Sequence, residues 1–278
     1  MMPMLLLCAT PIGNLGDLTP RVREALTTCD AVYCEDTRRT LTLLNHIGIK
    51  KQLVSCYREN ERQRAQEVVS RIQAGETIVY VSDAGMPGVS DPGEVLIAAC
   101  IEHNLPYSVL PGASAVLMAA VMSGLSAMPF SFFGFFPREK KAQKPLLEQL
   151  KRLDHTVIFY ESPNRVHATL TALLEGLGDL DAALLRELTK MHEETVRGKL
   201  SELAARYAEN DPRGECVICV YCRATAQAEN TPDLESLLKN LLSSGLSVRD
   251  AAAEAATICG VPKKEAYAKA LEIQSSLS

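Results

Sequence analysis

Short apolar stretches alternate with longer amphipathic stretches through roughly the first 115 residues of the chain. The short stretches are rich in Val, Ile, Leu and Tyr, which favours strands over helices. We predict strands at 4–10, 31–35, 52–57, 77–83 and 106–111. We predict helices at 20–29, 37–46, 60–74 and 93–103. This strand–helix alternation indicates parallel βαβ units in an α/β sheet.

A second α/β set follows after residue 115. It has predicted helices at 139–153 and 163–176 and predicted strands at 156–162, 182–188, 195–200 and 215–222. The segment 130–141, FSFFGFFPREKK, separates the two sets and is more typical of a hinge than of a strand or helix. We therefore predict an N-terminal α/β domain at 1–115 and a second α/β domain at 116–225.

The remaining residues, 226–278, predict a linker and a three-helix tail. Residues 224–233 are polar and lack periodicity, which is typical of a linker. Helical patterns follow at 233–243, 247–256 and 262–274. The spacing of the last two matches a helix-turn-helix, but any small three-helix bundle has the same spacing. Contact with nucleic acid and a role in packing or dimerisation are both compatible with this pattern.

Composition narrows the class of protein. Hydrophobic residues make up 47% and charged residues 23%, which is typical of a globular protein and excludes a mainly disordered chain. No stretch reaches the ~20 apolar residues needed to cross a bilayer, and no basic residue precedes the first apolar run, so we expect a cytoplasmic protein. The net charge of −5 excludes a uniformly basic surface, so any contact with nucleic acid must involve a local basic patch.

The cysteines suggest a metal site at only one place. Cys216, Cys219 and Cys222 have a CxxCxxC spacing, but they lie in the β-prone run GECVICVYC. Successive side chains of a strand alternate between faces, so Cys219 points away from the other two. We therefore predict a buried strand and no structural metal.

Four loops at the ends of predicted strands are rich in Gly, Pro, Asp and Ser. They lie at 10–20, 35–40, 81–93 and 111–115. Ligands of open parallel sheets bind outside the carboxyl ends of the strands, so these loops predict a binding site on one rim. No GxGxxG or GxxxxGK[ST] motif occurs, which argues against a dinucleotide or P-loop site.

The residues of these loops suit an adenosine that bears a cationic sulfonium and an amino-acid tail. Asp83 suits ribose hydroxyls or a positive centre. Ala113 and Ser114 begin a helix whose amides can meet a carboxylate.

Seven motifs occur in order: TPIGNLGDLTPR, CEDTR, VSDAGMPGVSDPG, PGASA, FFGFFPR, FYESPNR and RELTKMHEE. Together they resemble the ribosomal RNA small-subunit methyltransferase I family, which belongs to the tetrapyrrole-methylase-like (class III) methyltransferases. The resemblance spans residues 4 to about 222, and the tail also suits the family.

This resemblance implies two α/β domains of the tetrapyrrole methylase type, with S-adenosylmethionine in the cleft between them, plus a small helix-turn-helix-like domain. It implies a homodimer that methylates the ribose 2′-oxygen of cytidine 1402 in 16S rRNA, on the 30S subunit. The cofactor-binding residues that it implies are Pro11, Asp83, Met86, Ala113, Ser114, Tyr160 and Glu161.

The sequence departs from the tetrapyrrole branch, because SDAGMP replaces GGDP and the GRGGEE-type loop is missing. This favours RNA as the substrate. Two alternatives are a methylase of a small tetrapyrrole-like molecule on the same fold and a non-catalytic RNA-binding assembly factor.

A ribose 2′-hydroxyl is a weak acid, so a base or an alkoxide-stabilising cation would help the reaction. We expect Asp36 or Glu187 to act as the base, and Lys190 or Arg38 as the cation. The other interpretation of each residue is an exposed ion pair or a helix cap, because Asp36 precedes the helix predicted at 37–46.

A local excess of four positive charges at 138–152 predicts contact with RNA. The residues we expect to bind RNA are Arg138, Lys140, Lys141 and Lys144. The preceding aromatic run has two interpretations, hinge-core packing or stacking on bases. Its members are Phe132, Phe133, Phe135 and Phe136.

Overall fold

The computed structural model describes residues 2–224 and 233–277. These residues form two compact units. The larger unit holds the described residues up to 150 together with 154–222, and the smaller unit holds 151–153 and the described residues from 223 onward. Residues 225–232, which make up most of the predicted linker, lie outside this description.

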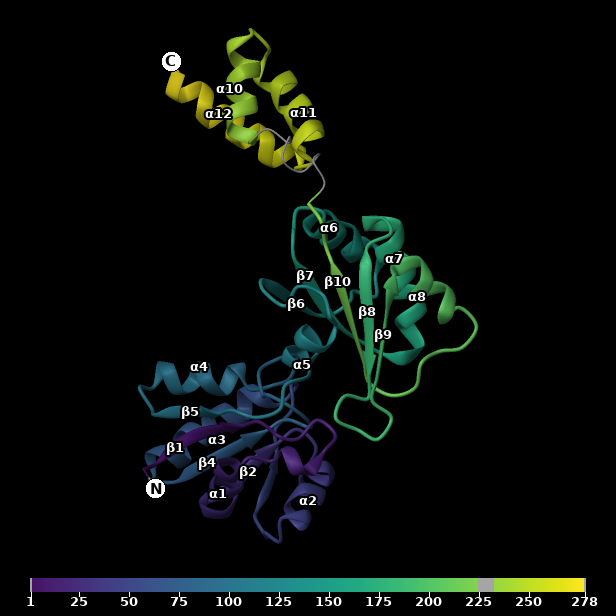
Figure 1. Cartoon of the computed structure of the whole chain (residues 1–278). Helices are drawn as coiled ribbons and strands as arrows, with labels where there is room; N and C mark the ends of the chain where they lie inside the picture. The colour runs from purple at the N-terminus through teal and green to yellow at the C-terminus, as the bar shows by residue number, and fades with distance from the viewer. Residues whose placement is uncertain (1, 225–232, 278) are drawn as a thin grey trace. The chain divides into compact units, whose positions relative to one another are not determined.

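The first half of the larger unit contains a five-stranded parallel sheet in the order β3-β2-β4-β1-β5 (Figure 1). Its strands are β1 (Met4–Cys8), β2 (Ala31–Cys34), β3 (Leu53–Ser55), β4 (Thr77–Val81) and β5 (Tyr107–Leu110). Its helices are α1 (Pro20–Thr28), α2 (Thr37–His46), α3 (Glu61–Gln73), α4 (Glu94–Glu102) and α5 (Ala115–Met122), with a short 3₁₀ helix at Leu15–Asp17. The parallel α/β sheet predicted from the alternation is confirmed.

Alternation of side chains along the strands produces the two cores of this sheet. Leu6 and Val79 point to one face, where they pack with Leu26 of α1 and Leu44 of α2. The neighbouring strand residues point to the opposite face and pack against α3 and α4. Helices therefore cover both faces, which is why the strands read as nearly continuous apolar runs.

The second half of the larger unit contains a mixed sheet in the order β6-β7-β10-β8-β9. Its strands are β6 (Phe130–Phe135), β7 (Thr156–Glu161), β8 (Asp181–Arg186), β9 (Glu194–Lys199) and β10 (Cys216–Tyr221). Only the β6–β7 pair is parallel. Its helices are α6 (Lys140–Leu150), α7 (Val166–Leu177) and α8 (Leu200–Arg206), with a 3₁₀ helix at Pro163–Arg165.

The hinge predicted at 130–141 is wrong for its first half, because residues 130–135 form a strand that pairs with β7. A bulge between Phe132 and Phe135 interrupts the alternation, so the segment shows no strand periodicity. Helix α8 was not predicted either.

Helix α5 joins the two halves through a shared core. Its Val116 and Ala119 pack with Ile158 and Val217 of the second sheet, and with Ile12 from the loop after β1. The ends of the first-sheet strands are thereby held against the second sheet.

The buried strand predicted around the cysteines is confirmed as β10. Cys216, Cys219 and Cys222 are all buried, and burial raises the pKa of each thiol to about 12. Among the residues that the structure describes, no cluster of His, Cys, Asp and Glu is arranged to hold a metal ion.

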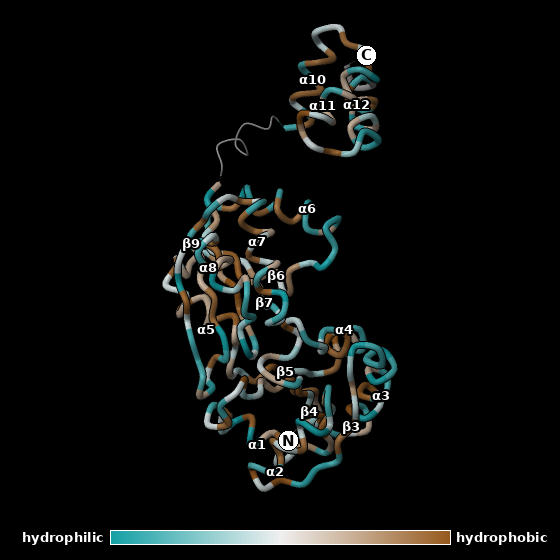
Figure 2. The backbone as a smooth tube through the Cα atoms, turned by 90° about the vertical axis from the view of Figure 1, so that its right-hand side faces the viewer, coloured by the Kyte–Doolittle hydropathy of each residue, from teal (hydrophilic) through white to brown (hydrophobic). Residues whose placement is uncertain are grey.

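The smaller unit contains the three predicted helices, α10 (Leu234–Ser243), α11 (Val248–Cys259) and α12 (Lys263–Leu277). Hydrophobic and hydrophilic residues alternate along them in Figure 2, and their apolar faces meet around Leu238, Ala255 and Ala270. Gly260 takes the left-handed conformation (φ 68°) that ends α11 before the turn into α12. In the described part of the chain, no helix has the length and hydropathy of a membrane span.

Candidate functional site

A cavity of about 620 Å³ opens at the carboxyl ends of the first sheet's strands. One side is formed by the segments that follow β2 and β4 and by the start of α5. The other side is formed by β6, β7 and the loops next to β8 and β10 of the second sheet. Seven of the predicted site residues line it: Asp83, Met86, Ser114, Tyr160, Glu161, Glu187 and Lys190.

Four of the residues predicted for cofactor binding and catalysis do not line the cavity, namely Pro11, Asp36, Arg38 and Ala113. In each case the next or the preceding residue does, as Ile12, Glu35, Arg39 and Ser114 are part of the lining. The motifs therefore lie in loops that border the cavity, whereas the direction of each side chain depends on local hydrogen bonds.

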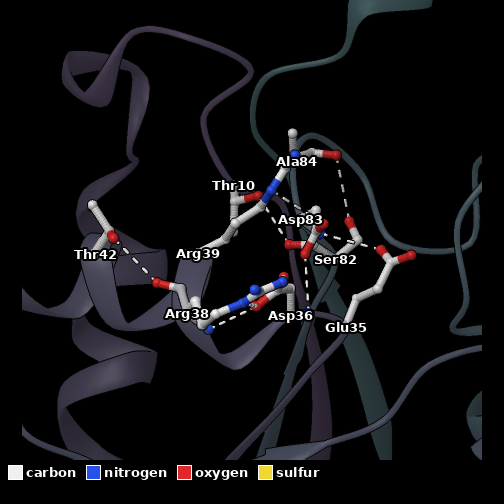
Figure 3. Close-up of polar contacts among 9 residues, drawn as sticks. All are labelled: Thr10, Glu35, Asp36, Arg38, Arg39, Thr42, Ser82, Asp83 and Ala84. Carbon is white, nitrogen blue, oxygen red and sulfur yellow. Dashed lines mark hydrogen bonds and ion pairs between the residues drawn. The ribbon is translucent and has the colours of Figure 1, made fainter.

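Asp83 connects the loops after β2 and β4 (Figure 3). Its Oδ1 accepts a hydrogen bond from the backbone N–H of Asp36 at 3.0 Å, and its Oδ2 lies 3.4 Å from Nε of Arg39. Its own N–H donates to Glu35 Oε2 at 3.4 Å. These contacts fix the Asp83 carboxylate at the cavity wall.

The first-sheet side of the cavity is acidic. Glu35 and Asp91 line it together with Asp83. Burial raises the pKa of Glu35, and the negative charges of Asp83 and Asp91 raise it further. Burial also raises the pKa of Asp91, although a hydrogen bond with Ser82 opposes this. Three carboxyl groups this close favour a ligand that brings positive charge.

Asp36 caps α2. Its Oδ1 accepts from the N–H of Arg38 at 2.8 Å, and its Oδ2 accepts from the Arg38 guanidinium at 2.6 Å. The hydrogen bonds from Arg38 hold the pKa of Asp36 well below its usual range. The Arg38 side chain is 89% exposed. These contacts match the helix-cap and exposed-ion-pair interpretation of both residues.

Backbone hydrogen bonds hold two of the loops beside the cavity together. Thr10 and Gly85 exchange two backbone hydrogen bonds, of 2.8 and 3.0 Å, which tie the loop after β1 to the loop after β4. Gly85 has a φ of +77°, which favours glycine. The side chain of Ser114 makes no capping hydrogen bond at the start of α5, and the backbone N–H of Val116 donates to the Tyr160 hydroxyl instead.

Three charged residues meet on the opposite side of the cavity. Lys190 Nζ lies 2.7 Å from Glu187 Oε1 and 3.0 Å from Glu215 Oε2, and Glu187 Oε1 also accepts from the N–H of Glu215 at 3.1 Å. The hydrogen bond from Lys190 is the main cause of the lowered pKa of Glu187. Burial lowers the pKa of Lys190, but its bonds to Glu187 and Glu215 outweigh this and raise it. Glu187 and Lys190 are therefore both ionised at neutral pH.

Two glycines make room for this arrangement. A Cβ on Gly13 would lie 2.9 Å from Thr189 Oγ1 and 3.0 Å from Lys190 Cε, so the loop after β1 packs against the Lys190 side chain. A Cβ on Gly214 would collide with the Glu187 carboxylate. Glu187 itself has a φ of +52°, which is rare for a residue other than glycine.

Tyr160 and Glu161 border the cavity at the end of β7, and the Glu161 side chain is fully buried. Burial raises the pKa of Tyr160 to about 12, so the phenol stays protonated. Both oxygens of Glu161 already have partners in their own half of the unit. Oε1 accepts from Ser162 N–H at 2.8 Å and lies 3.0 Å from the Arg165 guanidinium, and Oε2 accepts from Thr169 at 2.7 Å.

The residues that we expect to bind RNA lie at and just before the start of α6. Arg138, Lys140, Lys141 and Lys144 are all exposed. They follow β6 directly, and Phe135 at the end of β6 borders the cavity.

Sequence reasoning missed Glu35, Arg39, Asp91 and Glu215. Glu35 and Asp91 belong to quoted motifs, and Arg39 directly follows one, so the signal was present but these residues were not assigned to the site. Glu215 lies 28 residues from Glu187 in the chain, and only the pairing of β8 with β10 brings the two together.

Comparison with known proteins identifies the family to which this chain belongs. The family model described as Tetrapyrrole (Corrin/Porphyrin) Methylases matches residues 4–204, and the model described as RsmI C-terminal HTH domain matches residues 228–274. The chain is 40% identical over 280 residues to the ribosomal RNA small subunit methyltransferase I of Synechocystis sp., with 99% of both chains covered. It is 38% identical over 272 residues to the Bacillus subtilis protein of the same name, covering 96% of this chain and 93% of that protein.

The fold also matches a solved structure of uroporphyrin-III C-methyltransferase from Thermus thermophilus complexed with S-adenyl homocysteine. The TM-score is 0.56 at 19% identity, and the match covers 78% of this chain and 96% of that chain. At this identity the match shows the fold alone, whereas the sequence matches extend over nearly the whole chain. The chain thus belongs to the tetrapyrrole methylase family and, within it, to the ribosomal RNA small subunit methyltransferase I family.

Proposed function

We propose that this chain uses S-adenosylmethionine to methylate the ribose 2′-oxygen of cytidine 1402 in 16S rRNA, on the 30S subunit and as a homodimer. One observation carries the proposal: a single cavity has an acidic wall on one side and a lysine held between two carboxylates on the other. The relatives of this chain are named as methyltransferases of small-subunit ribosomal RNA.

The cavity suits S-adenosylmethionine in size and in charge. Its volume of about 620 Å³ is typical of a site for a molecule of this size. The carboxyl groups of Glu35, Asp83 and Asp91 suit the sulfonium and ammonium charges, and the first amides of α5 suit the carboxylate. When bound, the cofactor supplies a methyl group that is already activated by the positive sulfur.

The chain's own contribution is then to hold the ribose and to stabilise its oxygen. Lys190 stays protonated, so it donates hydrogen bonds and stabilises negative charge that develops on the 2′-oxygen. Glu187 has a lowered pKa and is a weak proton acceptor, so its carboxylate orients Lys190. The proton of the 2′-hydroxyl passes to solvent as the bond between the oxygen and the methyl group forms and the bond between the methyl group and the sulfur breaks. Asp36 and Arg38 lie outside the cavity lining, and we assign neither of them a part in the reaction.

The exposed basic residues at the start of α6 supply the RNA contact in this proposal. They come shortly after β6, which ends at the cavity. An RNA segment bound along these residues therefore brings a nucleotide to the site. Their number is small, which agrees with a net charge of −5 and a substrate that also offers shape, such as an assembled ribosomal subunit.

The test is to incubate the protein with methyl-labelled S-adenosylmethionine and either 30S subunits or naked 16S rRNA, and to map the label by nuclease digestion and mass spectrometry. We expect label on the ribose of cytidine 1402. Lys190→Met should abolish labelling while cofactor binding persists, and Lys50→Met, at an exposed position outside the cavity, should not. Absence of ribose label with both substrates would overturn the proposal, and sedimentation analysis tests the homodimer separately.

A further inference from the structure

The four phenylalanines around the end of β6 have different environments. Phe133 stacks on Phe159 with a centroid distance of 5.6 Å, and Phe136 meets the same ring edge-on at 5.5 Å and is 1% exposed. Phe132 packs on Tyr160 at 4.7 Å within the core beneath α5. Phe135 is the exception, because it is 54% exposed and borders the cavity.

A bulge places Phe135 there. In the pairing of β6 with β7, Phe132 is opposite Ile158 and Phe135 is opposite Tyr160, so three steps along β6 match two steps along β7. Gly134 within the bulge has a φ of +66°, a conformation that favours glycine.

The consequence of the bulge is a change of face. In a regular strand, residues three apart point to opposite faces, so Phe135 would lie on the face away from Phe132. Here both rings contact Tyr160, at 4.7 and 6.0 Å. Phe135 thus has an exposed ring beside Tyr160 at the cavity. A side chain that served only to fill the core would be buried. Bulges of this kind commonly re-aim a side chain next to an active site.

We propose that Phe135 is a substrate-positioning residue whose ring stacks on the base of the target nucleotide or of its immediate neighbour. This inference rests on the proposed function, since it assumes an RNA substrate. An exposed ring offers a π-face to a base, and stacking of this kind is a main means of holding unpaired nucleotides. The position favours RNA over the cofactor's adenine, because only two residues separate Phe135 from Arg138 and the exposed lysines of α6 follow.

The experiment compares Phe135→Ala, Phe135→Leu and Phe135→Trp with the unmodified protein, using 30S subunits for kinetics and calorimetry for S-adenosylmethionine. Loss of one stacked base corresponds to a rise of roughly 5- to 150-fold in the KM for RNA. We expect this rise for Phe135→Ala and most of it for Phe135→Leu, which keeps an apolar side chain without a π-face. Phe135→Trp should restore most of the affinity. Cofactor affinity should be unchanged in all three variants.

Ile101→Ala is the matched control, because Ile101 is a similarly exposed apolar residue (58%) on α4 and outside the cavity lining. It should leave the KM for RNA unchanged. Equal KM for Phe135→Ala and the unmodified protein would overturn the inference while the proposed function stands, and so would a loss of cofactor affinity that accounts for the whole effect. Absence of ribose methylation by the unmodified protein would overturn both.

Discussion

The backbone of Gly13, in the loop after β1, lies directly against the side chain of Lys190, from the loop after β8. A Cβ on Gly13 would reach to 3.0 Å from Lys190 Cε and closer still to Cγ. The first sheet therefore helps to set the direction of a lysine that belongs to the second sheet. This contact couples the cofactor side of the cavity to the group that we assign to the ribose oxygen.

Gly13→Ala should displace Lys190 without removing its charge. The added methyl group forces the lysine stem away from Glu187 and Glu215, so the ammonium moves relative to the reacting oxygen. We expect kcat to fall about 100-fold, the effect of a displacement of about 1 Å at a reacting centre. Cofactor affinity measured by calorimetry should change little. Gly16→Ala, in the same loop, is the control because its nearest neighbour is the side chain of Asn14.

The pH dependence of the rate should respond to the carboxylates around Lys190. Glu187 and Glu215 raise the Lys190 pKa, so Glu187→Gln or Glu215→Gln lowers it. Because the protonated lysine is the active form in our proposal, the alkaline limb of kcat against pH should move to lower pH in both variants. Glu193→Gln should not shift this limb, since Glu193 accepts from Thr189 N–H at 2.6 Å and does not contact the ammonium. An unchanged limb in all three variants would count against a protonated Lys190 in the reaction.

The first sheet, and the loops at which the cavity opens, could be predicted from the sequence because they depend on local signals. Strand–helix alternation and Gly- and Asp-rich strand ends are both properties of short segments. The side chains that line the rim were harder to choose, as the pairs Glu35/Asp36 and Arg38/Arg39 show. Asp36 caps α2, whereas its neighbour Glu35 lines the cavity. Which of the two carboxylates reaches the cavity depends on the conformation of the folded loop.

In the second half of the larger unit, strand β6 and the contact between Glu187 and Glu215 were not predicted, for a different reason. The β6 bulge cancels the alternation by which a strand is recognised, so its aromatic run is not periodic. The contact between Glu187 and Glu215 depends on which strands of a mixed sheet pair, and the sequence does not encode this locally. The first half of the predicted hinge therefore proved to be a strand, and Glu215 was not found as a partner of Lys190.

Asp83 should contribute electrostatically to cofactor binding. Asp83→Asn keeps the size of the side chain but removes a negative charge from the cavity wall, and we expect the Kd for S-adenosylmethionine to rise about tenfold, equivalent to about 1.4 kcal/mol. Calorimetry measures this directly. Asp36→Asn is the matched control, since it alters an acidic residue of the adjacent loop outside the cavity lining. Equal losses in the two variants would show that the loop structure, and not the charge of Asp83, supports binding.

Glu161 should matter chiefly for stability. Its carboxylate is fully buried and accepts hydrogen bonds from Ser162 and Thr169 while it pairs with Arg165. Glu161→Ala leaves Arg165 without this partner, which should lower the free energy of unfolding by about 3 kcal/mol. Thr169→Val, which removes one hydrogen bond, should cost about 1 kcal/mol. Urea denaturation checks both values. A Glu161→Ala protein of normal stability that no longer binds S-adenosylmethionine would instead make Glu161 a cofactor contact.

If the basic residues at the start of α6 bind RNA phosphates, they should contribute to the salt dependence of RNA binding. Each phosphate contact that is lost lowers the slope of log K against log [salt] by about 0.7 for a single strand. Reversing the charge at Lys140, Lys141 and Lys144 should therefore weaken binding to 30S subunits and flatten this slope, with no change in cofactor affinity. Lys50→Glu is the control. Lys50 is exposed and precedes the amino end of β3, whereas the cavity lies at the carboxyl ends of the strands. If the triple variant keeps the slope of the unmodified protein, RNA is held elsewhere, and the helices of the smaller unit become the surface to test.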